Sequence, residues 1–316
     1  MPYEEKISVI MSVYREKVLW LNKAIESVLE QTHANFEFII VVDDPTRSDL
    51  VNRVSEYAKN DERIIVLINE KNEGLVYSLN RALKHVTSDY VIRMDADDIS
   101  VKDRFEKQLI YLIDNKVDLV GSQVIFIDEN GKKMFDTAGE LHLSSKYIYK
   151  VLNFQNCIYH PSWMVKTSLY EKLNGYRNIN YCEDFDFLLR AKNMGAQMAN
   201  IAEPLVLYRY NNSGISRMNK ATQRCITKYM CSKRKEIEKI SVEEINGIIK
   251  ERKKEVIDCE KYYRYSQEAI DAKSEGKIIA MFIASFQCIL RTKNGRIKFI
   301  EVCRDKWLFL LEHIKV

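Results

Sequence analysis

The chain has 316 residues, of which 46% are hydrophobic and 30% are charged, as is ordinary for a soluble globular protein of one large domain, or of one domain and an appendage. Its net charge of +4 is divided unevenly. Residues 1–216 carry 26 basic and 31 acidic side chains, a net charge of −5, and residues 217–316 carry 23 basic and 14 acidic side chains, a net charge of +9. The seven cysteines form no Cys-x-x-Cys pair, which argues against a disulfide framework or a zinc site.

The expected location is a reducing cytoplasm. The first ten residues, MPYEEKISVI, lack the basic segment followed by an apolar segment that marks a secretory signal. The longest apolar run, residues 278–290, has 13 residues, which is too short to span a bilayer and suits a buried or interfacial helix. Any attachment to a membrane is therefore expected to be peripheral, at the inner face of the plasma membrane.

Strand and helix patterns alternate over residues 1–130. Strands are predicted at 7–13, 36–44, 63–69, within 89–100 and at 117–128, and helices at 16–32, 48–60, 74–86 and 101–115, the last of which Ser100 could cap. Strands separated by helices of this length indicate βαβ crossovers, and hence an α/β fold with a mostly parallel sheet flanked by helices. Residues 131–216 have a mixed pattern, with a helix near 143–152.

From about residue 217 the strand patterns end and only helices are predicted, so we expect a domain over 1–216 and a basic, helical C-terminal region over 217–316. The basic runs SKRKEIEK and KERKK in this region have two explanations. They are either solvated helix faces or a contact with an anionic membrane surface or a lipid-linked phosphate. No nucleic-acid partner is expected.

Acidic side chains follow two of the predicted strands. In DYVIRMDADDIS, Asp95, Asp97 and Asp98 come directly after an apolar run, and like charges at this density need a compensating cation or hydrogen-bond network. Three carboxylates suit Mg²⁺ or Mn²⁺, whereas a helix cap at Asp97 or Asp98 explains one of them. Asp43 and Asp44 end another strand. In an open α/β sheet, ligands bind in the crevice at the carboxyl ends of the strands, so these residues either face that crevice together with Asp95–Asp98 or form an Asx-turn into PTRSD.

Five segments occur in the order and spacing of glycosyltransferase family 2: ISVIMSVYRE, EFIIVVDDPTRSD, NEGLVYSLNRAL, DYVIRMDADDIS and YCEDFDFLLRA. The chain resembles that family over about residues 5–216. The resemblance implies the GT-A fold and an inverting, metal-dependent transfer of a sugar. The donor would be a nucleotide-sugar, such as a UDP-hexose or UDP-N-acetylhexosamine, and the acceptor a hydroxyl of a glycan or lipid-linked oligosaccharide in surface polysaccharide synthesis.

The resemblance also implies a donor site. Ser12 and Tyr14 would line the nucleotide base pocket, although ordinary packing also explains Tyr14. Asp44 would accept a hydrogen bond from the uracil imide. Two departures from the family pattern, Val13 where proline is usual and Pro45 where glycine is usual, lie beside these residues. Because these departures could reshape the base pocket, the resemblance implies uracil as the base less firmly than it implies the fold.

For the acidic cluster, the resemblance implies unequal roles. Asp97 would bind the Mn²⁺ or Mg²⁺ that bridges the diphosphate. Asp95 would contact the ribose or the metal shell, and Asp98 would be a further ligand.

The family further places a catalytic base in YCEDFDFLLRA. Asp184 would deprotonate the acceptor hydroxyl, with Glu183 as the fallback, although Asp184 also suits a helix N-cap. His160 would contact the sugar or the acceptor, with a packed structural histidine as the alternative. Arg209 would pair with phosphate oxygens. Asn211 stands where the family often has a histidine near the metal, and since asparagine is a weaker, neutral ligand, the resemblance leaves open whether this position contributes to the metal site.

Two other functions compete with this interpretation. YVIRMDADDI also resembles the strand and Asp-x-Asp motif of haloacid-dehalogenase-like phosphohydrolases, but that motif typically lies on the first strand, and here three predicted strands precede it. An inactive scaffold at the membrane is the other alternative. The absence of a glycine-rich N-terminal loop disfavours a nucleotidylyltransferase, and the absence of Gly-x-Gly-x-x-Gly disfavours a dinucleotide dehydrogenase.

Overall fold

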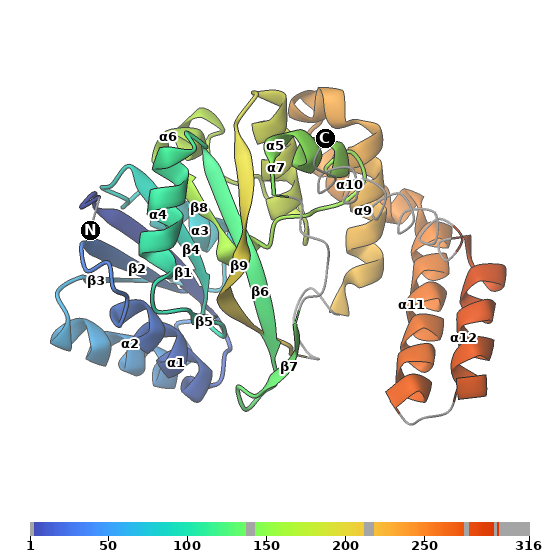
Figure 1. Cartoon of the computed structure of the whole chain (residues 1–316), viewed down its shortest axis with the longest axis horizontal. Helices are drawn as coiled ribbons and strands as arrows, with labels where there is room; N and C mark the ends of the chain where they lie inside the picture. The colour runs from blue at the N-terminus through green and yellow to red at the C-terminus, as the bar shows by residue number, and fades with distance from the viewer. Residues whose placement is uncertain (1–2, 137–142, 212–217, 275–277, 294–295, 297–316) are drawn as a thin grey trace.

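The computed structural model describes residues 3–136, 143–211, 218–274, 278–293 and 296 (Figure 1). The strands are β1 (Ile7–Val13), β2 (Phe36–Val42), β3 (Ile64–Ile68), β4 (Tyr90–Asp95), β5 (Ile99–Ser100), β6 (Leu119–Ile127), β7 (Lys133–Asp136), β8 (Met164–Lys166) and β9 (Met198–Arg209). The helices are α1 (Val18–Leu29), α2 (Ser48–Asn60), α3 (Leu75–Leu83), α4 (Arg104–Asp114), α5 (Ser145–Val151), η1 (His160–Ser162), α6 (Thr167–Lys172), α7 (Glu183–Asn193), α9 (Lys220–Ser232), η2 (Arg234–Lys239), α10 (Val242–Glu251), α11 (Lys253–Ser274) and α12 (Ile278–Arg291).

The strands form one mixed sheet in the order β3-β2-β1-β4-β8-β6-β9-β5, with β7 paired to β6. The four N-terminal strands pair in parallel, as the predicted βαβ units require, and β6 pairs in parallel with β9. The short strand β8 separates these two groups and pairs antiparallel with both β4 and β6. The predicted α/β architecture is therefore confirmed, and the antiparallel strand in its centre is an addition that the sequence pattern does not reveal.

Helices cover both faces of the sheet, and each face has its own hydrophobic core. Successive side chains of a strand point to opposite faces, so Val9 and Met11 of β1 belong to the core that includes residues of α1, α2 and α4. Ile10 belongs to the core that includes residues of α3, α5, α6 and α7. We call these the α1 face and the α7 face. Most of the candidate site residues described below come from the carboxyl ends of β1, β2 and β4 and from α7.

Helices α9 and α10 extend the core of the α7 face. Ile226 of α9 and Ile245 of α10 are fully buried in the same cluster as the residues of α7. The Arg177 guanidinium donates to the carbonyl oxygens of Ile237 (3.1 Å) and Ile240 (2.8 Å). The predicted boundary at 216/217 lies outside the described residues, so the division into two domains stays a prediction.

Helices α11 and α12 lie side by side as a hairpin at the edge of the molecule, beyond α9 (Figure 1). The predicted helical character of the C-terminal region is confirmed for α9 to α12, and residues 297–316 lie outside the described part. None of the helices described combines the length and the apolar character needed to cross a bilayer.

Candidate active site

The acidic loop consists of Asp95, the last residue of β4, and of Asp97 and Asp98 in the turn between β4 and β5. Each residue offers a carboxylate oxygen, and these three atoms lie within 4.8 Å of one another. Helix α4 begins at Arg104, so a helix cap explains neither Asp97 nor Asp98. The predicted cap at Ser100 is also wrong, because Ser100 pairs with β9 in strand β5. The acidic loop therefore has no role in capping α4.

Burial makes the negative charges of the acidic loop unfavourable. Burial raises the pKa of Asp97 to about 7, with a further contribution from the charge of Asp95. Burial, followed by the charge of Asp97, raises the pKa of Asp98 well above its ordinary value. The Oδ2 atom of Asp98 is buried without a hydrogen-bond partner. Clustered carboxylates with an unsatisfied oxygen match the ligands of a hard divalent cation, so these residues fit Mg²⁺ or Mn²⁺.

Arg209, at the end of β9, holds the acidic loop in place. Its backbone N–H donates to Asp98 Oδ1 (2.7 Å) and its Nε donates to the carbonyl oxygen of Asp97 (2.7 Å). Its Nη1 donates to the carbonyl oxygen of Asp128 (2.7 Å), and the guanidinium lies 5.1 Å from the centre of the Trp20 ring. Because Arg209 is buried and engaged in this way, it braces the loop, and its predicted phosphate contact stays a prediction. Beyond Asn211, the family's closing loop lies outside the described residues.

Arg93 is a buried cation that the motifs do not single out. It lies two residues before Asp95 on the same face of β4, and the two side chains form an ion pair. Its positive charge lowers the pKa values of Glu183 and Asp184 on α7, against the larger effect of burial. Arg93 thus connects the acidic loop electrostatically with the predicted base. The available sequence signal is an arginine within an otherwise apolar strand, YVIRM.

Asp184 lies in the first turn of α7, whose N-cap residue is Cys182, so the N-cap alternative for Asp184 is wrong. Its Oδ1 accepts a hydrogen bond from the backbone N–H of Phe185 (2.6 Å), and its Oδ2 accepts one from Asn156 Nδ2 (2.8 Å). Burial raises the pKa of Asp184, and these hydrogen bonds and Arg93 oppose the rise. The orientation of this carboxylate is thus fixed by two donors.

Glu183 has a strongly raised pKa. Burial, followed by the charge of Asp184, raises the pKa of Glu183 to about 8. Glu183 is therefore mainly protonated at neutral pH, which favours Asp184 as the base and leaves Glu183 as the fallback. Asn156, which the motifs do not single out, has its amide orientation set by Ile158, whose N–H donates to Asn156 Oδ1 (2.9 Å).

The predicted base-pocket residues lie at the carboxyl ends of β1 and β2. Ser12 of β1 is paired in register with Asp95 of β4, so it adjoins the acidic loop. Tyr14 is partly exposed just beyond β1, and the Arg15 guanidinium lies 4.7 Å from the centre of its ring. Glu16, which the motifs do not single out, accepts a hydrogen bond from the backbone N–H of Tyr14 (2.7 Å), and burial raises its pKa.

Asp43 and Asp44 have separate tasks. Asp43 accepts hydrogen bonds from Asn69 Nδ2 (2.6 Å) and from the backbone N–H of Gly74 (3.0 Å), so it shapes the entry to α3. Asp44 forms the Asx-turn considered as an alternative, since its Oδ1 accepts from the N–H (3.1 Å) and hydroxyl (2.5 Å) of Thr46. Its Oδ2 lies 3.5 Å from Arg15 Nε. The turn engages Oδ1 alone, and the contact with the uracil imide stays a prediction.

His160 is buried among aromatic rings on the α7 face. Its Nε2 lies 2.8 Å from the Tyr176 hydroxyl, and its ring centre lies 4.5 Å from that of Trp163. Burial, followed by the charge of Arg93, lowers the pKa of His160 well below its ordinary value, so the ring is neutral at pH 7. This is the packed arrangement considered as the alternative, and a sugar contact stays a prediction.

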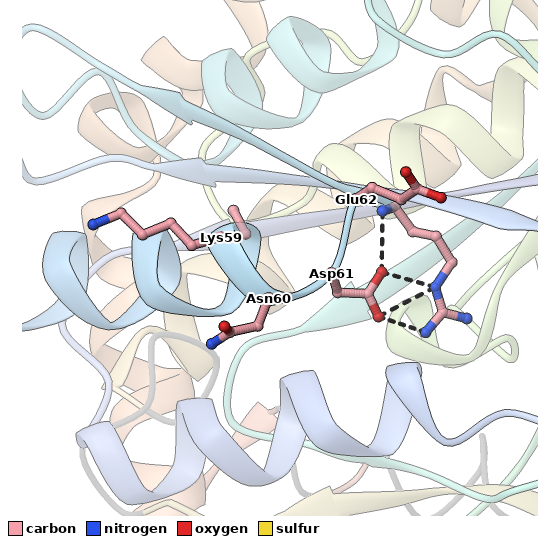
Figure 2. A pocket seen from close by; sticks show the side chains of 6 residues that line it. Lys59, Asn60, Asp61 and Glu62 are labelled. Atoms are coloured by element: carbon pink, nitrogen blue, oxygen red, sulfur yellow. Dashed lines mark hydrogen bonds and ion pairs between the residues drawn. The ribbon is translucent and has the colours of Figure 1, made fainter.

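A separate open pocket lies at the turn between α2 and β3, lined by residues 58–63 (Figure 2). Arg63 and Asp61 form an ion pair there, with Nη2 and Oδ2 2.6 Å apart. This turn leads into the amino end of β3, whereas the acidic loop follows the carboxyl end of β4, which runs in the same direction. The pocket therefore takes no part in the candidate active site.

A family model described as Glycosyl transferase family 2 matches residues 8–173, which is more than half of the chain. The chain belongs to glycosyltransferase family 2. An uncharacterized glycosyltransferase of Methanocaldococcus jannaschii is 36% identical to it over 65% of this chain and 71% of the relative. The O-antigen biosynthesis glycosyltransferase WbnJ of Escherichia coli is 31% identical to it over 70% of this chain and 86% of the relative. Membership in this family excludes the phosphohydrolase alternative.

Solved structures show that this family 2 glycosyltransferase has the GT-A fold. A fragment of TarS from S. aureus, in complex with UDP-GlcNAc, matches with a TM-score of 0.57 at 14% identity, over 90% of this chain and 91% of that chain. The chain spans 37% of a longer TarS structure. The mannosyltransferase PcManGT of Pyrobaculum calidifontis, in complex with GDP-Man and Mn²⁺, matches with a TM-score of 0.57 at 15% identity. The match covers 99% of this chain and 87% of that chain.

Proposed function

We propose that this glycosyltransferase transfers a hexose or N-acetylhexosamine from a UDP-sugar to a hydroxyl of a glycan or lipid-linked oligosaccharide in surface polysaccharide synthesis. The acceptor class is supported by the relative named for O-antigen biosynthesis. The uridine nucleotide is supported by TarS in complex with UDP-GlcNAc, while the GDP-Man complex of the mannosyltransferase makes guanosine the alternative.

One observation carries the mechanism: the buried cation Arg93 pairs with Asp95 of the acidic loop and also acts electrostatically on Asp184. The acidic loop suits the diphosphate side of the donor, and Asp184 the acceptor side. The acceptor oxygen would attack the anomeric carbon, and the bond from that carbon to the diphosphate oxygen would break. The hydroxyl proton would pass to Asp184, and the configuration would invert. General-base assistance of this kind contributes about 10²–10⁴ to the rate.

The oxygen ligands of Asp97, Asp95 and Asp98 would hold Mn²⁺ or Mg²⁺. When bound, the ion would offset the negative charge that grows on the leaving diphosphate. Arg209 supports this role because it hydrogen-bonds the backbone carbonyl of Asp97 and the carboxylate of Asp98 and so fixes the loop.

A screen of UDP release tests the proposal. UDP-glucose, UDP-galactose and their N-acetylated forms, with GDP-mannose as the comparison, are each incubated with the enzyme and Mn²⁺ and again with a chelator. We expect UDP release from at least one UDP-sugar and its loss with the chelator. Activity that survives chelation would contradict the metal assignment, and no release from any donor would support the inactive scaffold.

A second part of the proposal concerns location. The excess of basic residues over 217–316 favours attachment to an anionic membrane surface, where a lipid-linked acceptor resides. Deleting this region is a poor test, because buried residues of α9 and α10 belong to the core of the α7 face. Vesicle binding by the whole chain at low and high salt is the suitable measurement, and we expect binding that weakens as salt rises.

A further inference from the structure

Helix α12 (Ile278–Arg291) has a row of large apolar residues that point away from its hairpin partner α11. The row, which we call the α12 stripe, follows helical spacing and each residue in it is more than half exposed: Ile279, Phe282, Ile283, Phe286 and Leu290. On the opposite side, Ala284 and Cys288 are buried, and Cys288 Sγ donates to the carbonyl oxygen of Tyr262 of α11 (3.7 Å). The packing of the hairpin therefore does not account for the stripe.

The position of the hairpin separates the stripe from catalysis. Figure 1 shows α12 as the outermost helix described, on the far side of α11 from α9 and the sheet. An exposed row of five large apolar side chains is rare on a surface that meets only water, and it marks a site of contact with a protein or a membrane.

Charge distinguishes between these two partners. No acidic residue occurs in the sequence from 278 to 296, while Arg291 lies exposed at the C-terminal end of α12 and Lys293 and Arg296 lie exposed just beyond it. The Arg291 side chain also hydrogen-bonds Tyr265 of α11, and the Lys293 N–H donates to Asp258 Oδ1 of α11 (3.2 Å). An apolar face with cations at its border matches the boundary between lipid headgroups and acyl chains, where anionic phosphates lie beside hydrocarbon.

The dimensions of α12 fit the same partner. At about 1.5 Å per residue, its 14 residues extend for about 21 Å, well short of the ~30 Å hydrocarbon core of a bilayer. A helix of this length and polarity lies along a membrane surface and does not cross it.

We propose that the α12 stripe is the surface on which this enzyme docks to an anionic lipid bilayer. The apolar side chains enter the headgroup boundary, and Arg291, Lys293 and Arg296 lie near the lipid phosphates. The inference rests on the membrane part of the proposed function and is independent of the donor, the metal and the base.

The test compares the whole chain with two double variants. Phe282→Ser with Phe286→Ser removes the centre of the stripe, and Leu19→Ser with Met194→Ser removes exposed apolar residues from the sheet domain as a matched control. Sedimentation with phosphatidylcholine vesicles, with and without phosphatidylglycerol, measures binding. Thermal unfolding, light scattering and UDP release without vesicles measure folding, mass and catalysis.

We expect the unsubstituted chain to bind the anionic vesicles, the stripe variant to bind them about tenfold more weakly or worse, and the control to bind normally. Melting temperature, mass and UDP release should not change. Equal binding by the stripe variant would overturn the docking surface while leaving the membrane role intact. No binding by the unsubstituted chain would overturn both, and UDP release would still test the catalytic proposal separately.

Two other occupants of the stripe give different results. If a second copy covers it, the unsubstituted chain forms a dimer that the stripe variant loses. If another part of the same chain covers it, the stripe variant melts at a clearly lower temperature, because the substitutions then affect a buried contact. Either result would refute docking to the membrane through α12.

Discussion

Asp184 and Glu183 are adjacent in the chain, and burial raises the pKa of both, but only Asp184 has two hydrogen-bond donors to its carboxylate. Two hydrogen-bond donors and the charge of Arg93 stabilise the ionised form of Asp184, whereas burial keeps Glu183 mainly protonated at pH 7. Asp184→Asn should therefore lower the rate of sugar transfer by about 10²–10⁴ without weakening donor binding. Glu183→Gln, which mimics the protonated side chain, should retain most of the rate. Steady-state kinetics of UDP release with acceptor present measures both variants, and the reverse order would make Glu183 the base.

Asn156 should set the pH at which the base becomes active. Its hydrogen bond favours the ionised carboxylate, so Asn156→Ala should raise the pKa of Asp184 further above its ordinary value. Because a base works only when deprotonated, the acidic limb of kcat/KM should move to higher pH. Activity should be lost most at low pH and recover as pH rises.

Asn153 provides the control, since its Oδ1 accepts from Lys192 Nζ (2.6 Å) in the same region. Asn153→Ala should leave the pH profile in place. A uniform loss of activity at every pH in Asn156→Ala would indicate a structural role instead.

The sequence predicts carboxylates more readily than the residues that govern them. Asp95, Asp97 and Asp98 stand out because clustered acidic residues after an apolar run need an explanation, and Asp184 stands out through the family resemblance. Arg93 and Asn156 act through contacts with residues distant in the chain, and an isolated arginine or asparagine in a sequence does not reveal its partners. His160 was ambiguous for the same reason, since its packing depends on Tyr176 and Trp163.

At the scale of elements, the end of β9 supports the loop after β4. Arg209→Lys keeps the positive charge but loses the planar arrangement of donors that reaches Asp97 and Asp128. We expect a loss of about 1–3 kcal/mol in unfolding free energy and a weaker response of UDP binding to Mn²⁺. Chemical denaturation and calorimetric titration of UDP at several Mn²⁺ concentrations measure the two effects.

The matched control for Arg209→Lys is Arg53→Lys, because Arg53 forms a surface ion pair with Glu56 (2.8 Å). This control should change neither stability nor UDP binding. Stability that falls in Arg209→Lys without any change in the Mn²⁺ response would mean that Arg209 supports the fold alone.

The regular elements could be predicted where local periodicity decides them. The strands β1 to β4 follow the sequence pattern because they are apolar runs, of which β1 and β2 are buried on both faces. The helices α1 to α4 follow it because each buries one apolar face against the sheet. Strand β8 has only three residues and owes its position to pairing with β4 and β6, which no local pattern shows. Ser100 likewise joins β5 instead of capping α4, because β9 offers it a hydrogen-bonding partner.

At the scale of the whole molecule, the buried acidic loop should reduce stability until a cation binds. Mn²⁺ together with UDP should therefore raise the melting temperature, and a chelator should reverse the rise. Ligand at a hundred times its dissociation constant would add about 2.7 kcal/mol.

Asp97→Asn should abolish most of the rise caused by Mn²⁺ with UDP, whereas Asp89→Asn, at an exposed residue before β4, should not. Differential scanning calorimetry of the unsubstituted chain and both variants measures the effect. An equal rise in Asp97→Asn would locate the cation elsewhere.

The packing of α9 and α10 on the α7 face affects how this enzyme can be recombined with its relatives. Arg177 joins Asp186 of α7 to the backbone carbonyls of η2 and the residue after it, so the helix that bears the predicted base shares its supports with the C-terminal region. A chimera that exchanges sugar specificity between family members should therefore be spliced after α10, near Arg252, and not at the end of β9. Limited proteolysis should likewise release the α11–α12 hairpin and leave a catalytic core that retains α10.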